Sequence, residues 1–403
     1  MKELSSHPGS DSFKVALISE EYPPFAFGGI ASACNDLAHA LSQKGISTTV
    51  FCGRSSRILT ERVNDNLQII RLPCFDLPPR FVWFQLQNLQ VLSRSLREYS
   101  LLHIVNPQAG AIITYLNRTL RKPIVTSIHG LRLATLKLSM NIPFSLRTPW
   151  DIGDYLIGYP LDALLHDICL RHSNHVTVCS HSALAELRSL YTDLNPEKVS
   201  VIHNGIDFKE ICNYPKVDEN SSSIIFYGRL NYLKGVTYLI RAIASLQSNF
   251  PDLHLKIFGD GPLRRKIERL VSKLGLSKKV TIAGFVARQE LVTEIAKASI
   301  VVLPSLHEAQ PVGLLEGMAC RKPVVAFDFP FSREVIQDMQ NGLLAKGCDV
   351  KDLSEKIRML LADKKLRQRL GQNAYAHVRK THDWTTLVNQ YISVYLSMVA
   401  YHE

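Results

Sequence analysis

Short runs of valine, isoleucine and leucine alternate with amphipathic helical segments along this chain, and the alternation limits the fold more than any other feature. Strands separated by helices pair in parallel, because each helix returns the chain to the starting end of the sheet. The alternation occurs twice. The predicted strands are residues 13–19, 46–52, 101–105, 123–128, 174–179 and 198–202, followed by 224–228, 253–258, 280–283, 299–303 and 323–327. We therefore predict the α/β fold class, with two Rossmann-like, doubly wound domains in tandem.

A polar stretch at residues 218–223 separates the two sets of strands and marks a change of domain. The 403 residues are also many for one hydrophobic core, since a domain averages about 150 residues. We predict an N-terminal domain over 1–210 and a second domain over 211–383. An amphipathic helix in 384–403, beginning at Trp384, is expected to pack back on the first domain.

Charge and cysteine content bound the class of protein. A formal net charge of +11 favours anionic partners, either phosphates or acidic lipid surfaces. Nucleic acid is not predicted, because no basic helix carries interleaved base-reading side chains.

The cysteines and the N-terminus indicate the compartment. Eight cysteines without a C-x-x-C pair indicate reduced thiols. The polar N-terminus has the features of neither a signal peptide nor a membrane span, so we expect a cytoplasmic protein. No metal site is predicted, since the histidines at 166, 172, 175 and 181 fall on a helix, a strand and a turn.

Two turns of the first half follow predicted strands and carry candidate site residues. Gly28 and Gly29 come after the first strand and open a helix, where glycines allow a backbone to approach a phosphate closely. His129 ends another strand of the same sheet and is expected at the same edge. In the alternative interpretation, the glycines form an ordinary tight turn and the histidine is structural.

The second half carries cations and glycines in the same kind of position. Gly228, Arg229 and Lys234 follow its first strand, which places a guanidinium and an ammonium at the start of a helix. Two cations and a helix N-terminus suit a diphosphate without a metal ion, although solvated surface charge is the alternative. Gly261 lies in a Gly-Asp-Gly-Pro turn after the next strand, where bare backbone leaves room for a base or a ribose.

Two glutamates, Glu308 and Glu316, stand in the loop after strand 299–303 and in the helix that follows it. Ligands of open α/β sheets bind at this end of the strands. The carboxylates can accept hydrogen bonds from sugar hydroxyls, and Val312 and Gly313 would offer backbone N–H groups to a phosphate. Exposed glutamates are common in helices, so the two glutamates alone do not indicate a ligand site. The loop between them supports one, because its backbone could bind a phosphate.

Taken together, the motifs resemble glycosyltransferase family 4, whose members have the GT-B fold of two Rossmann-like domains facing across a cleft. The resemblance spans nearly the whole chain. It rests on five segments in the family's order: the Tyr22-Pro-Pro turn with Gly28-Gly29, His203-Asn-Gly-Ile-Asp207, Gly228-Arg with Lys234-Gly235, Gly259-Asp-Gly-Pro262, and the Glu-x7-Glu segment of Glu308 and Glu316.

The resemblance implies a retaining transfer of a sugar from a nucleotide diphosphate-sugar to an acceptor hydroxyl on a glycan, a glycolipid or a lipid-linked intermediate. It implies UDP or GDP as the nucleotide, with no metal and no other cofactor. It also implies Arg229 and Lys234 on the diphosphate, Glu316 on the ribose, Glu308 on the donor sugar and His129 beside the sugar and the leaving group.

The chain departs from the family's common pattern in three places. Ala309 and Arg321 stand where glycine is frequent, and residues 329–334 lack the usual Gly-Gly pair. The last change bears on donor-sugar contacts, so the sequence does not predict the sugar.

Other function classes fit less well. An inactive GT-B protein that only binds or scaffolds is the alternative, but the intact pairs Arg229/Lys234 and Glu308/Glu316 argue against it. A dinucleotide oxidoreductase would need a G-x-G-x-x-G turn, which Gly28-Gly29 does not provide. A glycan phosphorylase would share the fold, but it would be longer and carry pyridoxal phosphate.

Cationic and aromatic residues occur together in the acceptor-side domain. Residues 79–84 and 131–150 mix arginine and lysine with leucine, phenylalanine and tryptophan. This composition suits an anionic membrane surface or a lipid-linked acceptor, and we predict peripheral contact with the inner face of a membrane. Ordinary core packing explains the same residues.

Overall fold

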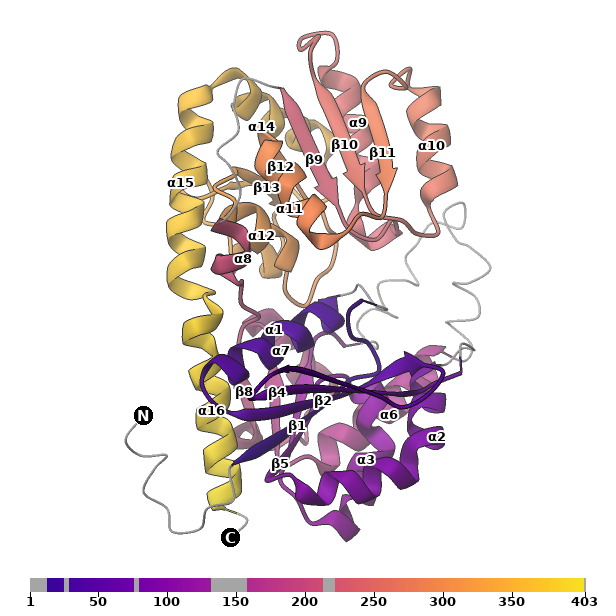
Figure 1. The fold of residues 1–403 in the computed structure, drawn as a ribbon. Helices are drawn as coiled ribbons and strands as arrows, with labels where there is room; N and C mark the ends of the chain where they lie inside the picture. Colours follow the sequence, from indigo (N-terminus) through magenta and orange to yellow (C-terminus); the bar gives the residue numbers. More distant parts are fainter. Residues whose placement is uncertain (1–12, 25–28, 76–79, 132–157, 213–221, 402–403) are drawn as a thin grey trace.

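The computed structural model describes residues 13–24, 29–75, 80–131, 158–212 and 222–401. Within these ranges the first half of the chain forms an eight-stranded sheet and the second half a six-stranded sheet. Figure 1 shows the two sheets in separate bodies, one above the other, with the last two helices running along one side of both. The architecture is the predicted pair of α/β domains.

The first sheet is parallel except at one edge, where β3 pairs antiparallel with β4. Across the sheet its strands are β3 (Leu59–Asn64), β4 (Leu67–Pro73), β2 (Ser47–Ser55), β1 (Lys14–Ile18), β5 (Leu101–Ile104), β6 (Ile124–Ile128), β7 (His175–Val178) and β8 (Val199–Val201). The helices described with it are α1 (Gly29–Gln43), α2 (Arg80–Ser95), α3 (Pro107–Leu120), α6 (Tyr159–His172) and α7 (His181–Leu190). The order of strands changes direction between β1 and β5.

The second sheet is parallel in every strand pair of its described residues. Across the sheet its strands are β11 (Val280–Gly284), β10 (His254–Phe258), β9 (Ser223–Tyr227), β12 (Ile300–Val302), β13 (Val324–Phe327) and β14 (Leu343–Ala345). The helices described with it are α8 (Phe208–Cys212), α9 (Val236–Leu246), α10 (Arg264–Lys273), α11 (Arg288–Lys297), α12 (Val312–Ala319), α13 (Pro330–Arg333), α14 (Val350–Ala362) and α15 (Lys364–Thr381). Here the order changes direction between β9 and β12.

Every strand predicted from the sequence is present, and β3, β4 and β14 are additional. All six residues of β3 are exposed, so this strand lacks the apolar face that identifies the others. It forms an antiparallel hairpin with β4, an element that a βαβ alternation does not predict. β14 has only three residues. The apolar pattern therefore missed the exposed β3 and the short β14, and it also missed β4, whose seven residues are all buried or half-buried and pair parallel with β2.

The last helix, α16 (Trp384–Ala400), packs on the first sheet although it follows the second domain in sequence. Its buried side chains join the core formed by β1, β2 and α1, and they are Trp384, Leu387, Val388, Tyr391 and Tyr395. The Tyr395 hydroxyl lies 2.5 Å from His103 Nδ1, and His103 Nε2 lies 2.7 Å from Ser127 Oγ. A buried polar network thus ties α16 to β5 and β6.

Stability should fall as the pH drops below about 6.5, because three histidines are buried in their neutral form. Burial lowers the pKa of His103 to about 3, that of His129 to about 4 and that of His382 to about 3. Below pH ~6.5 the unfolded chain binds protons that the folded chain does not, so acid favours unfolding. Each histidine should remove up to about 1.4 kcal/mol of unfolding free energy per pH unit between its two pKa values.

Urea unfolding at pH 7, 6 and 5 measures this loss. In His103→Asn the stability at pH 7 should be lower, but its dependence on pH should be weaker than in the parent protein. An unfolding free energy that is the same at all three pH values would contradict the assignment.

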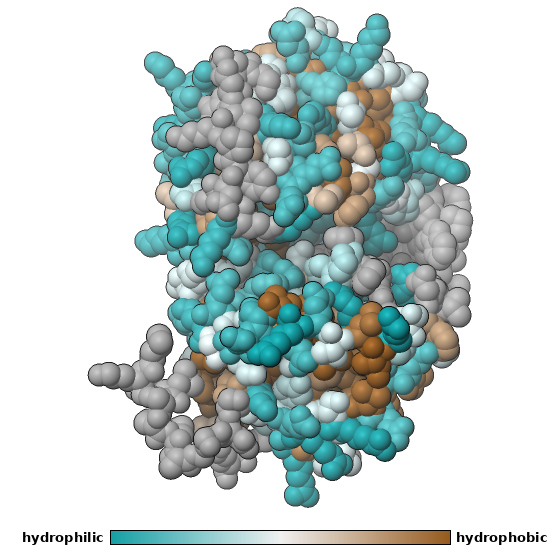
Figure 2. All heavy atoms as spheres, in the orientation of Figure 1, coloured by the Kyte–Doolittle hydropathy of each residue, from teal (hydrophilic) through white to brown (hydrophobic). Residues whose placement is uncertain are grey.

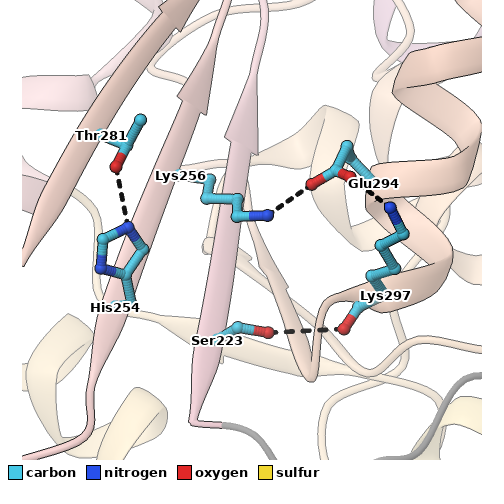
Figure 3. Close-up of polar contacts among 6 residues, drawn as sticks. All are labelled: Ser223, His254, Lys256, Thr281, Glu294 and Lys297. Atoms are coloured by element: carbon cyan, nitrogen blue, oxygen red, sulfur yellow. Dashed lines mark hydrogen bonds and ion pairs between the residues drawn. The ribbon is translucent and has the colours of Figure 1, made fainter.

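A half-buried ion pair fixes α11 to the second sheet (Figure 3). Lys256 Nζ on β10 lies 2.6 Å from Glu294 Oε2 on α11, and Lys297 Nζ lies 2.8 Å from Glu294 Oε1. Burial alone would raise the pKa of Glu294, but the hydrogen bonds from the two lysines lower it below its usual range. Since α11 begins at Arg288, this contact also fixes the position of that arginine.

The seven cysteines whose side chains the structure describes, at positions 34, 52, 74, 169, 179, 320 and 348, are free thiols. Burial raises the pKa of Cys169 and Cys179 to about 12, so both are protonated at neutral pH. In the part of the chain that the structure describes, no helix combines the length and apolar character needed to cross a membrane.

Candidate functional site

The second sheet places the predicted donor-side residues at one edge. The arrowheads of β9, β10 and β11 in Figure 1 point toward the first domain, so the carboxyl ends of these strands face it. Because the strand order changes direction between β9 and β12, the loops after these two strands leave the edge in opposite directions, as at the ligand sites of doubly wound sheets. The first loop carries Arg229 and Lys234, and the second carries Glu308 and leads to Glu316.

The turn after β9 holds Lys234 in place and leaves Arg229 accessible. A short 3₁₀ helix (Tyr232–Lys234) follows β9, and Asn231 Oδ1 accepts a hydrogen bond from Lys234 N at 3.2 Å. The Arg229 side chain is exposed. Gly228, at the end of the strand, lies beside the aliphatic part of Lys234, since a Cβ there would be 3.9 Å from Lys234 Cδ. The two predicted cations therefore stand at the same strand end.

Lys234 and Glu308 form an ion pair. Lys234 Nζ contacts Glu308 Oε1, and Ser305 Oγ donates to the same oxygen at 2.8 Å. The two charged side chains are 28% and 19% exposed, so water screens the pair only in part. Lys234, which was predicted to bind the diphosphate, is thus in direct contact with Glu308, which was predicted to bind the donor sugar. A bound diphosphate would contact Lys234 while Lys234 still contacts Glu308.

Glycine at position 313 lets α12 approach the sheet closely. A Cβ on Gly313 would lie 2.9 Å from Leu303 Cδ1, and the Tyr227 hydroxyl donates to Gly313 O at 2.5 Å. Val312 begins α12, and its N–H already donates to Gln310 O at 2.9 Å. Of the two predicted phosphate donors, Val312 therefore has a partner within the chain.

Glu316 pairs with an arginine from the neighbouring helix. Arg288 Nη1 lies 2.8 Å from Glu316 Oε1, and the Glu316 side chain is 12% exposed. The guanidinium holds the carboxylate in one orientation. Arg288 follows β11 and Glu316 follows β12, and in the sheet β10 and β9 lie between these two strands. The pair therefore lies at the same strand edge as Gly261, which follows β10.

Gly261 is required by the packing of two neighbouring turns. A Cβ there would lie 2.6 Å from Leu230 O and 2.8 Å from Leu230 N, contacts that no side chain could make. The turns are also joined by the hydrogen bond from Leu230 N to Asp260 O at 2.9 Å. The packing of Leu230 therefore explains the glycine, and a nucleoside contact at Gly261 stays a prediction.

His129, from the first domain, is half-buried beside this edge. Both of its ring nitrogens are buried and have no hydrogen-bond partner among the described residues. Burial lowers its pKa to about 4, so the imidazole is neutral at neutral pH. A Cβ on the next residue, Gly130, would lie 3.8 Å from Ala309 Cβ, which brings the end of β6 next to the loop that carries Glu308. A buried polar group without a partner costs about 1–3 kcal/mol, and such a group is expected where a ligand supplies the partner.

The paired glycines of the first domain are only partly described. Gly29 begins α1, and a Cβ there would meet no described atom within 4 Å. Gly28 lies outside the described residues. Of the two glycines, the structure describes only Gly29, and no described atom occupies the space beside it.

Sequence reasoning missed three residues of this site: Arg288, Tyr227 and Ser305. Arg288 follows a predicted strand, so the rule that identified Arg229 could also have found it. Tyr227 ends an apolar strand and Ser305 stands in a loop, and neither position carries a signal of its own. Both became recognisable only through their hydrogen bonds to Gly313 and Glu308.

The arrangement offers three cations, two oriented carboxylates and a neutral imidazole at the facing edges of two sheets. Cations at a strand end can neutralise a diphosphate, and carboxylates can bind hydroxyl groups. In the described ranges no three histidine, cysteine or acidic side chains are grouped so that they could hold a metal ion.

Two family descriptions match consecutive parts of the chain. "Glycosyltransferase Family 4" matches residues 27–210, and "Glycosyl transferases group 1" matches residues 207–377. Among curated proteins, an uncharacterized glycosyltransferase of Methanocaldococcus jannaschii is 26% identical over 399 residues, which are 95% of this chain and 97% of that protein.

Solved structures of glycosyltransferases have the same fold. Sucrose-phosphate synthase from Thermosynechococcus elongatus superposes with a TM-score of 0.78 over 96% of this chain and 100% of that chain, at 22% identity. HepE of Anabaena, solved in complex with UDP and glucose, superposes with a TM-score of 0.72 over 96% of this chain and 100% of that chain, at 17% identity. The chain belongs to glycosyltransferase family 4 and has the GT-B fold.

Proposed function

We propose that this glycosyltransferase is retaining and metal-independent, and that it transfers a sugar from a nucleotide diphosphate-sugar to a hydroxyl of a glycan, a glycolipid or a lipid-linked intermediate. The proposal rests above all on one observation. The loops after β9 and β12 bring Arg229, Lys234 and Glu308 to one strand edge, with Glu316 held beside them by Arg288.

The two cations support a mechanism without a metal ion. When the bond between the sugar and the diphosphate breaks, negative charge grows on the β-phosphate and the anomeric carbon gains positive character. Groups that are already in place where this charge develops stabilise the transition state more than the ground state. Arg229 and the Lys234–Glu308 pair are groups of this kind, with Lys234 on the leaving diphosphate and Glu308 on the sugar.

Retention is expected to follow a front-face route. In this route the acceptor hydroxyl attacks from the side that the diphosphate leaves, and a phosphate oxygen takes the proton. Glu308 as a covalent nucleophile is the alternative. The contacts of Glu308 with Lys234 and Ser305 favour the first route, because a carboxylate held by a cation and a hydroxyl is a weaker nucleophile. The neutral His129 would hydrogen-bond a sugar hydroxyl near the leaving group.

A panel of UDP-, GDP- and ADP-sugars tests the donor. The fold similarity to HepE, which was solved with UDP, favours a UDP-sugar. A ligand at 100 times its Kd should stabilise the protein by about 2.7 kcal/mol, which thermal unfolding detects. The stabilising donor should then be consumed in the presence of EDTA, with retained anomeric configuration in the product by NMR. If no member of the panel stabilises the protein, the inactive GT-B alternative replaces this proposal.

The acceptor side is expected to contact an anionic membrane surface. On the face shown in Figure 2, hydrophobic residues gather on the lower domain. Large apolar side chains of this domain that are at least two-fifths exposed are Ile58, Leu59, Val63, Phe75, Leu86, Tyr115 and Leu164. Trp83 of the predicted segment 79–84 packs edge-to-face on the exposed Phe75, at 5.9 Å between ring centroids. Of the segment 131–150, only Leu131 lies within the described residues.

Sedimentation with vesicles tests this contact. The protein should pellet with vesicles that contain phosphatidylglycerol at low salt, less so at high salt, and not with purely zwitterionic vesicles, because the attraction is electrostatic. If it does not pellet with anionic vesicles even at low salt, the acceptor is approached without the membrane.

A further inference from the structure

Two of the three places at which this chain departs from the family pattern, Ala309 and the segment 329–334, lie where the two domains touch, whereas Arg321 packs on Tyr375 of its own domain. Ala309 follows Glu308, and its methyl group packs against a hydrophobic cluster of the first domain that includes Ile128, Leu131, Val178, Ala183 and Leu187. Ser180 Oγ, which also caps α7 by accepting from Ala183 N at 2.9 Å, donates to Ala309 O. The residue directly after the sugar-binding carboxylate is therefore held by the other domain.

Gln310 adds a second contact across the domains. Its Oε1 accepts a hydrogen bond from Asn204 N at 2.7 Å, and Gln310 and Asn204 are each only 7% exposed. Asn204 lies between β8 and the point where the chain enters the second domain. Separation of the domains would expose the Gln310 amide and break this bond.

Glu334 makes the third contact, at the N-terminus of α7. Its Oε2 accepts from His181 N at 2.9 Å, and its Oε1 accepts from Ser182 N at 2.6 Å and from the Ser182 hydroxyl. A carboxylate is stabilised there by free N–H groups and by the helix dipole. Glu334 is the last residue of the segment 329–334, and through this carboxylate the segment contacts the first domain.

A fourth contact is weaker. His307 Nδ1 lies 3.5 Å from Glu186 Oε1. Burial raises the pKa of Glu186 to about 7 and lowers that of His307, so at neutral pH both groups are partly or wholly uncharged. We therefore assign no attraction between charges to this contact.

We propose that these contacts form an interdomain clasp, which holds the loop after Glu308 from the first domain and so fixes the position of that carboxylate. The clasp is defined by Ala309, Gln310 and Glu334 of the second domain and Ser180, Ser182 and Asn204 of the first. Glu308 itself is bound by Lys234 and Ser305 of its own domain, while the clasp holds the backbone that follows it. Gln310 and Glu334 are positioning residues, which do not touch the substrate. This inference rests on the proposed function only for its kinetic consequence.

Hydrogen exchange of the full-length protein tests the clasp directly. In Glu334→Ala and in Gln310→Ala, peptides that cover 304–311 and 180–186 should exchange faster, while peptides from α9 and α14 should not change. Glu355→Ala is the control, because Glu355 lies on α14 of the same domain and pairs with the exposed Arg358. Unchanged exchange in both peptides of both variants would overturn the clasp.

Kinetics test the positioning role. With the donor identified for the parent protein, kcat should fall by about 10- to 100-fold in Glu334→Ala, the effect of a misplaced group, while the Kd for UDP should stay within about twofold. Glu334→Gln should be intermediate, because its amide oxygen can still accept one N–H. Faster exchange with an unchanged kcat would overturn the positioning of Glu308.

Failure of the two proposals can be told apart. If the parent protein binds no nucleotide, the proposed function fails, and the exchange experiment still reports on the clasp. If nucleotide binds and turnover occurs but both clasp variants behave like Glu355→Ala, only the clasp fails. Gln310→Ala provides the second test should Glu334→Ala not fold.

Discussion

Alanine at Arg229 or Lys234 should lower kcat/KM by about 10²–10³, the loss seen when one preorganised electrostatic group is removed. Since negative charge on the diphosphate grows toward the transition state, each cation should affect kcat more than donor affinity. Lys234→Ala should be the more damaging of the two, because it also leaves the 19%-exposed Glu308 without its cation. Steady-state kinetics with the donor found in the panel measure both effects.

Three comparisons sharpen this prediction. Arg269→Ala removes an exposed cation from α10 of the same domain and should leave kcat/KM unchanged. Lys234→Arg should restore little activity, because a planar guanidinium does not fit where a compact ammonium contacts Glu308. Turnover should survive EDTA. Activity that EDTA abolishes and Mg²⁺ or Mn²⁺ restores, or near-normal turnover of the double alanine variant, would place the phosphate site elsewhere.

Glu316→Ala should weaken nucleotide binding by about 1.5–3 kcal/mol, or roughly 10- to 150-fold in Kd, the usual contribution of hydrogen bonds to a charged group. The reason is that Glu316, fixed by Arg288, would accept hydrogen bonds from the ribose hydroxyls. A 2′-deoxynucleotide should therefore bind weakly to the parent protein and lose little more in the variant. Calorimetry with UDP and 2′-deoxy-UDP gives both values.

Arg288 provides an internal check on the role of Glu316. If the arginine acts by orienting the carboxylate, Arg288→Met should weaken UDP binding, and the double variant should bind no more weakly than Glu316→Ala alone. Arg358→Met, which breaks an exposed pair on α14, is the matched control. If Glu316→Ala binds UDP as tightly as the parent protein, Glu316 does not bind the ribose. If the losses of affinity in the two single variants add fully in the double variant, Arg288 does not act through Glu316.

How far the sequence predicted the fold depended on burial. The predicted strands are rich in valine, isoleucine and leucine, and Gly29, which was expected to open a helix, begins α1. β3 could not be found because its side chains are exposed and it needs no apolar run. The hydrophobic pattern of a segment indicates which of its side chains are buried in the core, and no side chain of β3 is buried there.

The candidate site was predictable in its location but not in its pairings. Arg229, Lys234, Glu308 and Glu316 were identified because parallel strands bring their carboxyl ends to one edge. That Lys234 binds Glu308, and that Arg288 binds Glu316, depends on side-chain geometry that residue spacing does not encode. The contact of Glu334 with Ser182 joins residues 152 positions apart on different domains, so only the structure could show it.

The position of α16 has a consequence for how the protein is made. During synthesis the first sheet leaves the ribosome early, but α16, which completes its core, emerges only after the second domain. The core side chains that pack with Tyr391 and Tyr395 therefore stay uncovered while the second domain is translated. His103 lacks its tyrosine partner for the same period. A nascent chain that stalls after the second domain would therefore hold a folded second domain and an incomplete first domain, and would need α16 to complete the first.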